Sequence, residues 1–587
     1  SNKKFPQENL TAVRQSMRGH YLLGIEFIPY EYDFISKELK VFKNVEITVN
    51  EIGYYESIPT VSKKSKIFEN MYRGMVINED LTSDDTRSYQ EPSILYIIED
   101  YYSIMNNLIE WRRKQGFEVT VIERDDIGGS YNTTNIKNYI VNAYNNWDNP
   151  PEYVCLVGDA NGTIEVPTYT VGEGGSWWGA YGEGDFPYTL IEGGDNLPDI
   201  VVGRMSVRNT SELATVINKI IGYEKNYAGN TDWLNAAALI GDPYDSGIST
   251  VITNEYIENI MDIHGGITDI RTKYSGSGFD TFMRNEINDG VSYLNYRGFY
   301  GFSNFNTSDV DQLSNGYKLP FLTTLTCDTG SFETDNECIT ESLFRAGSTT
   351  SPKGSVAVIG TAQPYTHTAF NNIVAMGMYE GIFIQEAKTA GEALVYGQIA
   401  LAETYPQNPN NNVYYFATWN NLMGDPATQL WTARPQDLLV EHSDLYLSGS
   451  NNFQVKVTNQ FGQSYPDAIV SLYKQSNGNV QFQINGVTNE NGIVDFEIDN
   501  SVTGDVFVTT RCQNCIPVET EFEITNAYPE LTLDLNSIEI DDSNGNNDGN
   551  FNPGETVSVS FEIDNLSNQQ INNLSLEITS STNLMTL

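Results

Sequence analysis

The sequence predicts two α/β units followed by an all-β region, and three observations support this. Between residues 92 and 434, short apolar runs alternate with segments of helical periodicity. After residue 435 the helical periodicity stops, and runs of alternating polarity are separated by Gly/Asn turns. The chain has 587 residues, too many for one hydrophobic core, so we expect three or four domains.

The N-terminal part is predicted to be the end of a β domain joined to the rest by a linker. Polar and apolar residues alternate in HYLLGIEFIPYEYD (20–33) and KELKVFKNVEITVNE (37–51), as in half-buried antiparallel strands. We assign this domain to residues 1–55. Residues 56–91 are polar and contain few apolar positions, so they are predicted to form a linker or a poorly packed crossover.

Continuous apolar strands followed by amphipathic helices begin at residue 92, and this pattern is typical of βαβ units. In the first unit, ILYII (94–98) precedes a helix that ends near Gly116, and FEVTVI (117–122) follows. We assign residues 92–232 to subdomain A and 233–434 to subdomain B. The predicted strands of subdomain B are AAALIGD (236–242), VSYLNYRG (291–298), FLTTLTCD (321–328) and SVAVIGTA (355–362).

The charge and the hydropathy pattern exclude two classes of partner. The formal net charge is −44, so the surface would repel a polyanionic nucleic acid. No run approaches the roughly 18 apolar residues that a membrane span requires. The first residues, SNKK, show no signal peptide, so export has to be inferred from other features.

The cysteines predict one disulfide and at least one free thiol. Cys512 and Cys515 form a CxxC in a β-rich segment, with no second CxxC that would complete a zinc site. A local disulfide is the preferred interpretation. Cys155, Cys327 and Cys338 remain, and three cysteines cannot all be paired with one another.

Cys327 is the best candidate nucleophile. It follows the apolar strand FLTTLT, and sites in open α/β sheets gather beyond the carboxyl ends of the strands. Free backbone amides in the turn that follows could stabilise an oxyanion. The alternative is that Cys327 is simply a small buried apolar residue.

Several collinear motifs resemble the gingipain-type, caspase-like cysteine peptidases. Cys338 lies eleven residues after Cys327 and precedes a helix-like ITESLFRAGS, as in that family. The other matching segments are GDFPYTLIEGGDNLPDIVVGRMSV, GSVAVIGTA and MGDPATQLW. The resemblance covers roughly 92–434, and residues 435–526 resemble the immunoglobulin-like β-sandwich that follows in the same family. The N-terminal strands resemble the end of the family's pro-region.

The resemblance implies a secreted or cell-surface cysteine endopeptidase that acts on proteins or peptides through a thioacyl-enzyme. It also implies export by the type IX machinery, whose components would then be partners. Backbone amides at Gly298 and Cys327 are expected to form the oxyanion hole. Asp185 aligns with the acidic residue of the specificity pocket in arginine-specific members, which predicts a preference for basic residues; alternatively it caps a turn.

The sequence departs from the family at the general base. Where the family has Gly-His-Gly after the preceding strand, this chain has Gly298, Phe299, Tyr300 and Gly301. Phe299 has no group that accepts a proton, and Tyr300 is a poor base near neutral pH because the ordinary pKa of tyrosine is about 10. His367, on the loop after the next strand, is the hypothetical replacement base for Cys327; the alternative is a loop histidine bonded to backbone.

A candidate calcium loop lies in residues 527–587, which are predicted to be part of a further β domain. The segment 544–555 follows the spacing D-x-[DN]-x-[DN]-G-x5-E, with asparagine at the first position. The candidate Ca²⁺ ligands are Asp542, Asn544, Asn546, Asp548, Asn550 and Glu555. The alternative is a Gly/Asn surface turn.

Two other functions remain open at this point. Without the family histidine, the same fold could serve as a catalytically inactive pseudopeptidase with a binding or assembly role. Alternatively, the β domains could make this a cell-surface adhesion protein whose α/β region is only a scaffold.

Overall fold

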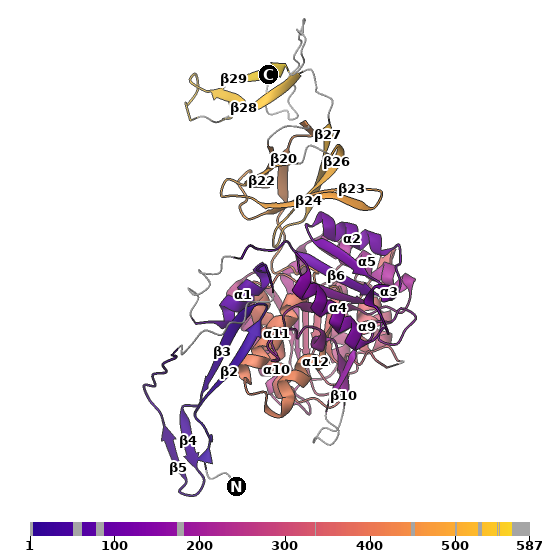
Figure 1. Ribbon diagram of the computed structural model, residues 1–587, viewed down its shortest axis with the longest axis vertical. Coiled ribbons are helices and arrows are strands. Elements are labelled where there is room, and N and C mark those ends of the chain that lie inside the picture. Colours follow the sequence, from indigo (N-terminus) through magenta and orange to yellow (C-terminus); the bar gives the residue numbers. More distant parts are fainter. Residues whose placement is uncertain are drawn as a thin grey trace.

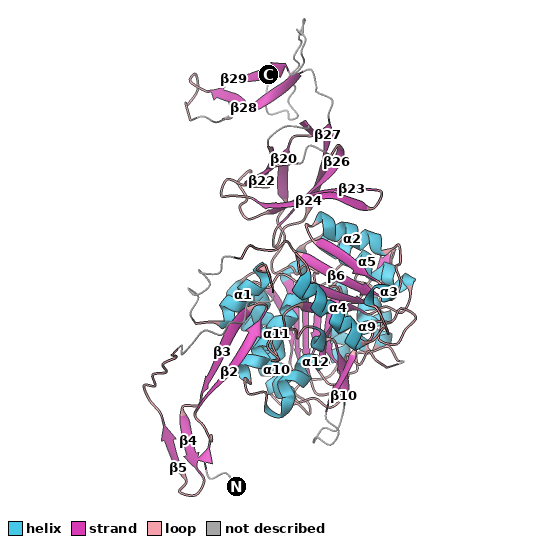
Figure 2. Cartoon of the chain, in the orientation of Figure 1, coloured by secondary structure: helices cyan, strands magenta, loops and turns pink. Residues whose placement is uncertain are grey.

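The computed structural model describes residues 4–50, 61–77, 87–172, 181–334, 336–447, 452–498, 502–525, 531–548, 550 and 552–565. An α/β region lies between an N-terminal group of strands and two C-terminal β modules (Figures 1 and 2). None of the described helices combines the length and apolar composition needed to cross a bilayer.

One ten-stranded sheet runs through the whole α/β region, in the order β13-β12-β14-β15-β18-β19-β11-β8-β6-β7. Both predicted subdomains contribute to it, because β19 pairs antiparallel with β18 and parallel with β11. The strands are β6 (Ser93–Ile98), β7 (Glu118–Ile122), β8 (Tyr153–Val157), β11 (Val201–Met205), β12 (Ala236–Gly241), β13 (Asp269–Lys273), β14 (Tyr293–Arg297), β15 (Phe321–Thr324), β18 (Ala357–Thr361) and β19 (Asn420–Met423).

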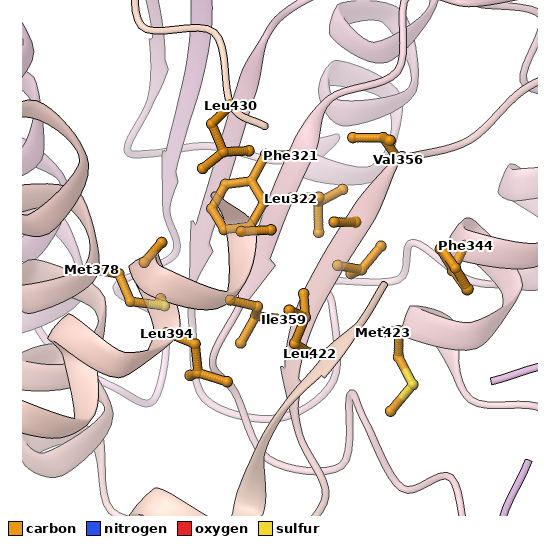
Figure 3. Close-up of a cluster of buried hydrophobic side chains, with 14 of the residues drawn as sticks. Phe321, Leu322, Phe344, Val356, Ile359, Met378, Leu394, Leu422, Met423 and Leu430 are labelled. Atoms are coloured by element: carbon orange, nitrogen blue, oxygen red, sulfur yellow. The ribbon is translucent and has the colours of Figure 1, made fainter. Parts of the chain in front are cut away.

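Helices cover the sheet and bury its central strands. They include α2 (Met105–Lys114), α4 (Thr133–Asn146), α5 (Thr210–Glu224), α6 (Ser249–His264), α7 (Phe279–Asp289), α9 (Ile339–Arg345), α10 (Thr368–Phe383), α11 (Ala390–Thr404) and α12 (Asn412–Trp419). Apolar side chains of β15, β18 and β19 meet those of the helices in the core (Figure 3). Every residue of these three strands is buried, because the sheet is covered on both faces.

The N-terminal strands are anchored to the α/β region by an arginine. The hairpin of β2 (Leu10–Met17) and β3 (His20–Phe27) turns at Arg18, whose buried side chain donates to the carbonyls of Pro151 and Asp199 and to Gln90. The strands β1 (Lys4–Phe5), β4 (Tyr30–Asp33) and β5 (Glu38–Val41) form a separate small sheet.

The described residues 61–77, inside the segment 56–91, differ from the linker that we predicted. Within it, α1 (Lys66–Met75) is an amphipathic helix capped by the Ser65 side chain. Its buried side chains include Phe68 and Met71, which pack into the main core. The polar residues around this short helix hide its periodicity in the sequence.

The region after residue 435 is a β-sandwich, as predicted. Its two sheets have the orders β20-β22-β25 and β21-β27-β26-β23-β24, and they enclose a second apolar core. Its strands are β20 (Leu438–His442), β21 (Leu445–Leu447), β22 (Phe453–Asn459), β23 (Ile469–Ser476), β24 (Asn479–Val487), β25 (Ile493–Phe496), β26 (Gly504–Arg511) and β27 (Val518–Thr525). Its assignment to the immunoglobulin-like type stays a prediction.

The predicted disulfide between Cys512 and Cys515 is present, and the turn that it closes contacts the α/β region. Asn514, at the tip, accepts hydrogen bonds from the amides of Thr432 (2.8 Å) and Ala433 (3.1 Å). The last described element is a hairpin of β28 (Leu531–Asp541) and β29 (Ser558–Asn565).

Candidate active site

Cys327 lies at the carboxyl edge of the large sheet, three residues after β15 ends. Its carbonyl accepts a hydrogen bond of 2.9 Å from the amide of Gly301, in the loop that follows the neighbouring strand β14. The residue is only 6% exposed. The structure therefore places the sulfur where two adjacent parallel strands end, as the sequence predicted.

The sulfur of Cys327 faces Thr366, on the loop that leads into α10. The amide of Thr366 donates to Sγ at 3.3 Å, and the Thr366 hydroxyl lies 3.1 Å from Sγ. That hydroxyl accepts from Asn371 (3.2 Å), whose side-chain oxygen in turn accepts from Asn420 (3.2 Å). A chain of polar side chains thus fixes the group that contacts the sulfur.

His367 directly follows Thr366 and is the N-cap residue of α10. Its Nδ1 accepts a hydrogen bond of 3.1 Å from the amide of Ala369. A neutral imidazole has one donor and one acceptor nitrogen, so this bond places the proton on Nε2. The hydrogen bond from the amide of Ala369 must break before Nδ1 can take a proton. The role of His367 as a base therefore stays a prediction.

Phe299 and Tyr300 occupy the loop where the family histidine was expected. Both side chains are exposed, and the Tyr300 hydroxyl donates to Asp328 at 2.6 Å. This hydrogen bond, reinforced by burial and by the charge of Asp328, raises the pKa of Tyr300 to about 12. Tyr300 is therefore neutral at physiological pH and does not act as a base.

The oxyanion hole that we predicted at the amides of Gly298 and Cys327 stays a prediction. Gly298 has a structural reason to be glycine, since a Cβ there would lie 2.1 Å from the hydroxyl of Tyr296. Asp328, immediately after Cys327, adopts a left-handed φ of 65° and turns the chain away from the strand. Ser331 donates to its carboxylate at 2.7 Å and holds this turn.

Asp185 has an internal partner that the sequence did not reveal. Arg204 donates to both of its carboxylate oxygens at 2.8 Å, and Thr168 adds a third hydrogen bond at 2.9 Å. Asp185 is 3% exposed. Because its charge is already balanced by a buried guanidinium, the structure supports a structural role here, and the specificity role stays a prediction.

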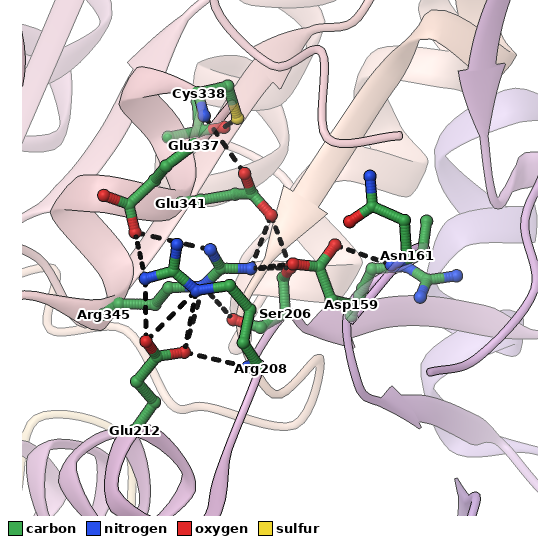
Figure 4. A network of polar contacts seen from close by, with 12 residues as sticks. Asp159, Asn161, Ser206, Arg208, Glu212, Glu337, Cys338, Glu341 and Arg345 are labelled. Carbon is green, nitrogen blue, oxygen red and sulfur yellow. Dashed lines mark hydrogen bonds and ion pairs between the residues drawn. The ribbon is translucent and has the colours of Figure 1, made fainter. Parts of the chain in front are cut away.

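A buried ionic network joins the two halves of the sheet near Cys338 (Figure 4). Arg345 of α9 donates to Asp159 and Glu341 at 2.6 Å each and to Ser206 at 2.8 Å. Cys338 is the N-cap of the same helix. Burial raises the pKa of the Cys338 thiol well above its ordinary value, and burial does the same to Cys155.

The candidate calcium loop connects β28 and β29, so its flanks are strands as predicted. Asp542 is buried, and the Oε1 atom of Glu555 accepts from the amide of Asn546 at 2.5 Å. Oε2 of Glu555 is buried and has no hydrogen-bond partner. Gly549 lies outside the described residues. Within the described part of the chain, no group of three or more His, Cys, Asp or Glu side chains is arranged to hold a metal ion.

Three groups at the site were missed by the sequence reasoning: Thr366, Asn371 and the buried side chain of Arg297. Arg297 ends the otherwise uncharged strand β14 and is 1% exposed. A charged residue at the end of a buried strand was the available signal. The threonine and the asparagine carry no such signal, because their roles depend on contacts between distant segments.

Comparisons against known proteins identify the family to which this fold belongs. Residues 87–431, more than half of the chain, match peptidase family C25, and the chain belongs to that family. This confirms the resemblance to gingipain-type peptidases at the level of the family.

The relatives that match are gingipains of Porphyromonas gingivalis. Gingipain R1 is 25% identical over 523 residues, which cover 83% of this chain and 50% of the relative. Lys-gingipain HG66 is 22% identical over 577 residues, covering 90% of this chain and 31% of the relative. The chain thus spans half or less of the length of these two proteins. The crystal structure of the Arg-specific cysteine proteinase gingipain R has a TM-score of 0.65 at 23% identity and covers 74% of this chain and 98% of that one, which supports the fold.

Proposed function

We propose that this chain is a cysteine endopeptidase in which Cys327 is the nucleophile. The observation that carries the proposal is the position of the sulfur in a family C25 fold: it lies at the carboxyl edge of the sheet and accepts a hydrogen bond from the amide of Thr366. An amide that donates to sulfur favours the thiolate, which is the nucleophilic form.

The reaction would proceed through a thioester. The sulfur loses its proton and attacks the carbonyl carbon of a peptide bond, and amides near Gly298 and Cys327 stabilise the oxyanion. The C–N bond then breaks, and the amine leaves with a proton supplied by the base. Water hydrolyses the thioester and restores the thiol.

In this proposal the base is His367. Taking the proton at Nδ1 requires loss of the hydrogen bond to Ala369, and an N-cap is worth about 0.5–2 kcal/mol. That cost is small enough for the ring to leave its cap during turnover. It also means that His367→Ala should destabilise α10 slightly, so stability must be measured alongside activity.

The decisive experiment is cleavage of a mixed peptide library by wild type, Cys327→Ala and His367→Ala. Loss of cleavage in both variants, with both folded, supports the pair. Loss with Cys327→Ala alone means that the thiolate acts without His367. If the wild-type protein cleaves nothing, the peptidase proposal is wrong.

A second candidate function is that of a pseudopeptidase that binds or assembles with partners. It is favoured by the residues Phe299 and Tyr300 in place of the family histidine and by the capping role of His367. A peptidyl chloromethyl ketone distinguishes the two functions, because only an active peptidase is labelled at Cys327.

We further propose that substrates are proteins or peptides and that the protein is secreted or held at the cell surface by type IX export. Membership of family C25 supports export and a protein or peptide substrate, and the net charge of −44 supports solubility. A preference for basic residues at the cleavage site would require the Asp185 carboxylate to leave the guanidinium of Arg204 and to bind the basic side chain of the substrate instead. Asp185→Asn leaving the library preference unchanged would reject that part of the proposal.

We also propose that the loop between β28 and β29 binds Ca²⁺ through Asp542, Asn544, Asn546, Asp548, Asn550 and Glu555. The ligand spacing and the unpartnered Oε2 of Glu555 support it. Calorimetry of the full chain with Ca²⁺, compared with Glu555→Gln, tests this; equal heats from both proteins would reject it.

A further inference from the structure

Arg297 and Cys327 approach the same helix terminus from neighbouring strands. Arg297 ends β14, and Cys327 follows β15, which pairs with β14 in parallel. The guanidinium of Arg297 donates to the side-chain oxygen of Asn372 at 2.9 and 2.8 Å and contacts the carbonyl of Thr368 at 3.4 Å. Asn372 and Thr368 belong to the first turns of α10, and the residue that contacts the sulfur, Thr366, lies just before that helix.

The guanidinium of Arg297 is buried without a counter-ion. Arg297 is 1% exposed, and its NH1 nitrogen has no hydrogen-bond partner. Among the described residues, no carboxylate forms an ion pair with it. Every other arginine in this protein that is at most 1% exposed, namely Arg112 and Arg204, does pair with a carboxylate.

The sulfur of Cys327 and the guanidinium of Arg297 contact the same short stretch of chain, the sulfur at Thr366 and the guanidinium at Thr368 and Asn372. Burial lowers the pKa of Arg297 to about 10. Negative charge on Cys327 opposes this decrease, and negative charge on Tyr296 opposes it to a smaller extent. At neutral pH the guanidinium still carries its positive charge, since a pKa of about 10 is well above 7. An unpaired buried cation is costly, and it is stabilised by an anion that forms beside it.

We propose that Arg297 is a positioning residue that keeps Cys327 as a thiolate, with the sulfur acting as the missing counter-ion of the buried guanidinium. This deepens the proposed function, because it rests on Cys327 being the nucleophile. The thiol proton leaves to solvent or to the base, and no bond other than S–H breaks. The loop after β14 lacks the histidine that the family has there. In this proposal the guanidinium at the end of β14 supplies the positive charge that the imidazolium of that histidine would carry.

The other groups around Cys327 are compatible with a thiolate. Asp328 directly follows Cys327, and its carboxylate is held by hydrogen bonds from Tyr300 and Ser331. Tyr300 and Tyr296 are neutral at pH 7, since the pKa of each is raised to about 12. His367 caps α10, whose N-terminus favours negative charge.

The test is the pH dependence of Cys327 alkylation, which needs no peptidase activity. Full-length protein is treated with iodoacetamide between pH 5 and 9, and the labelled Cys327 peptide is quantified by mass spectrometry. We expect wild type to react at pH 6 at least tenfold faster than an ordinary thiol, whose pKa is about 8.5. Arg297→Met should lose at least tenfold at pH 6, and Arg297→Lys should keep part of the advantage.

A matched control separates charge from structure. Asn372→Ala removes the acceptor that holds Arg297 but leaves the positive charge, so its alkylation profile should stay closer to wild type than that of Arg297→Met. Identical profiles for wild type and Arg297→Met would overturn the proposal. If Arg297→Met does not fold, the wild-type profile decides, because ordinary reactivity at pH 6 also overturns it. Fast alkylation that is lost in Arg297→Met, without any peptide cleavage by wild type, would reject the peptidase function but would still support a thiolate at Cys327 that depends on Arg297.

Discussion

Replacing Arg345 with methionine should be among the most destabilising single substitutions in the α/β region. Arg345, Asp159 and Glu341 have side chains that are 4%, 4% and 2% exposed, and the guanidinium is the cation between the two acids. Breaking a buried ion pair by removing one partner costs about 3–5 kcal/mol, because the remaining charge stays buried without compensation. Arg345→Met leaves two such carboxylates, so we expect a loss at or above the upper end of that range.

The same network contains its own control. Arg208 pairs with Glu212 and Glu337, but its side chain is 42% exposed. Exposed pairs contribute about 0–1 kcal/mol, so Arg208→Met should change the free energy of unfolding by no more than that. Urea denaturation followed by tryptophan fluorescence measures both variants.

The pH dependence of the difference provides a second check. Burial raises the pKa of Glu341, and the charge of Arg345 is the main effect that opposes this. Without Arg345 the pKa of Glu341 rises further, so the folded variant is stabilised by protonation and destabilised as the pH increases. The cost of Arg345→Met should therefore be larger at pH 8 than at pH 5. If Arg345→Met costs no more than Arg208→Met at pH 8, our account of the network is wrong.

Two further predictions concern buried acids and the contact between domains. Burial raises the pKa of Asp199 and of Glu152 to about 7 each. The stability that these two acids contribute is therefore complete below about pH 4 and is lost as the pH rises through 7. In Asp199→Asn, the melting temperature measured between pH 5 and 8 should depend less on pH. Asn514→Ala removes three hydrogen bonds to Thr432 and Ala433 and places alanine at a φ of 55°, which is strained, so hydrogen exchange at residues 430–436 should increase. Asn514→Gly loses the same hydrogen bonds without the strain, because glycine adopts a positive φ readily, so it should increase this exchange less. Equal exchange in wild type and Asn514→Ala would show that the turn does not hold the β-sandwich.

The sequence by itself determined the βαβ order, the β-sandwich, the local disulfide and the position of Cys327. Strands such as β6 and β8 are buried on both faces, so they are recognisable as nearly continuous apolar runs. The disulfide depends on two cysteines three residues apart, and the place of Cys327 depends only on where its own strand ends. All of these features are local in the chain.

Only the tertiary structure decided how the halves join and what surrounds the sulfur. The four-residue strand β19 carries two asparagines, and β13 is a half-exposed edge strand, so neither is distinctive in sequence. The contacts of Cys327 with Thr366 join residues 39 positions apart, and Arg345 reaches Asp159 across 186. A side chain's charge partner depends on which distant segments pack together, and residue type and periodicity do not specify that packing.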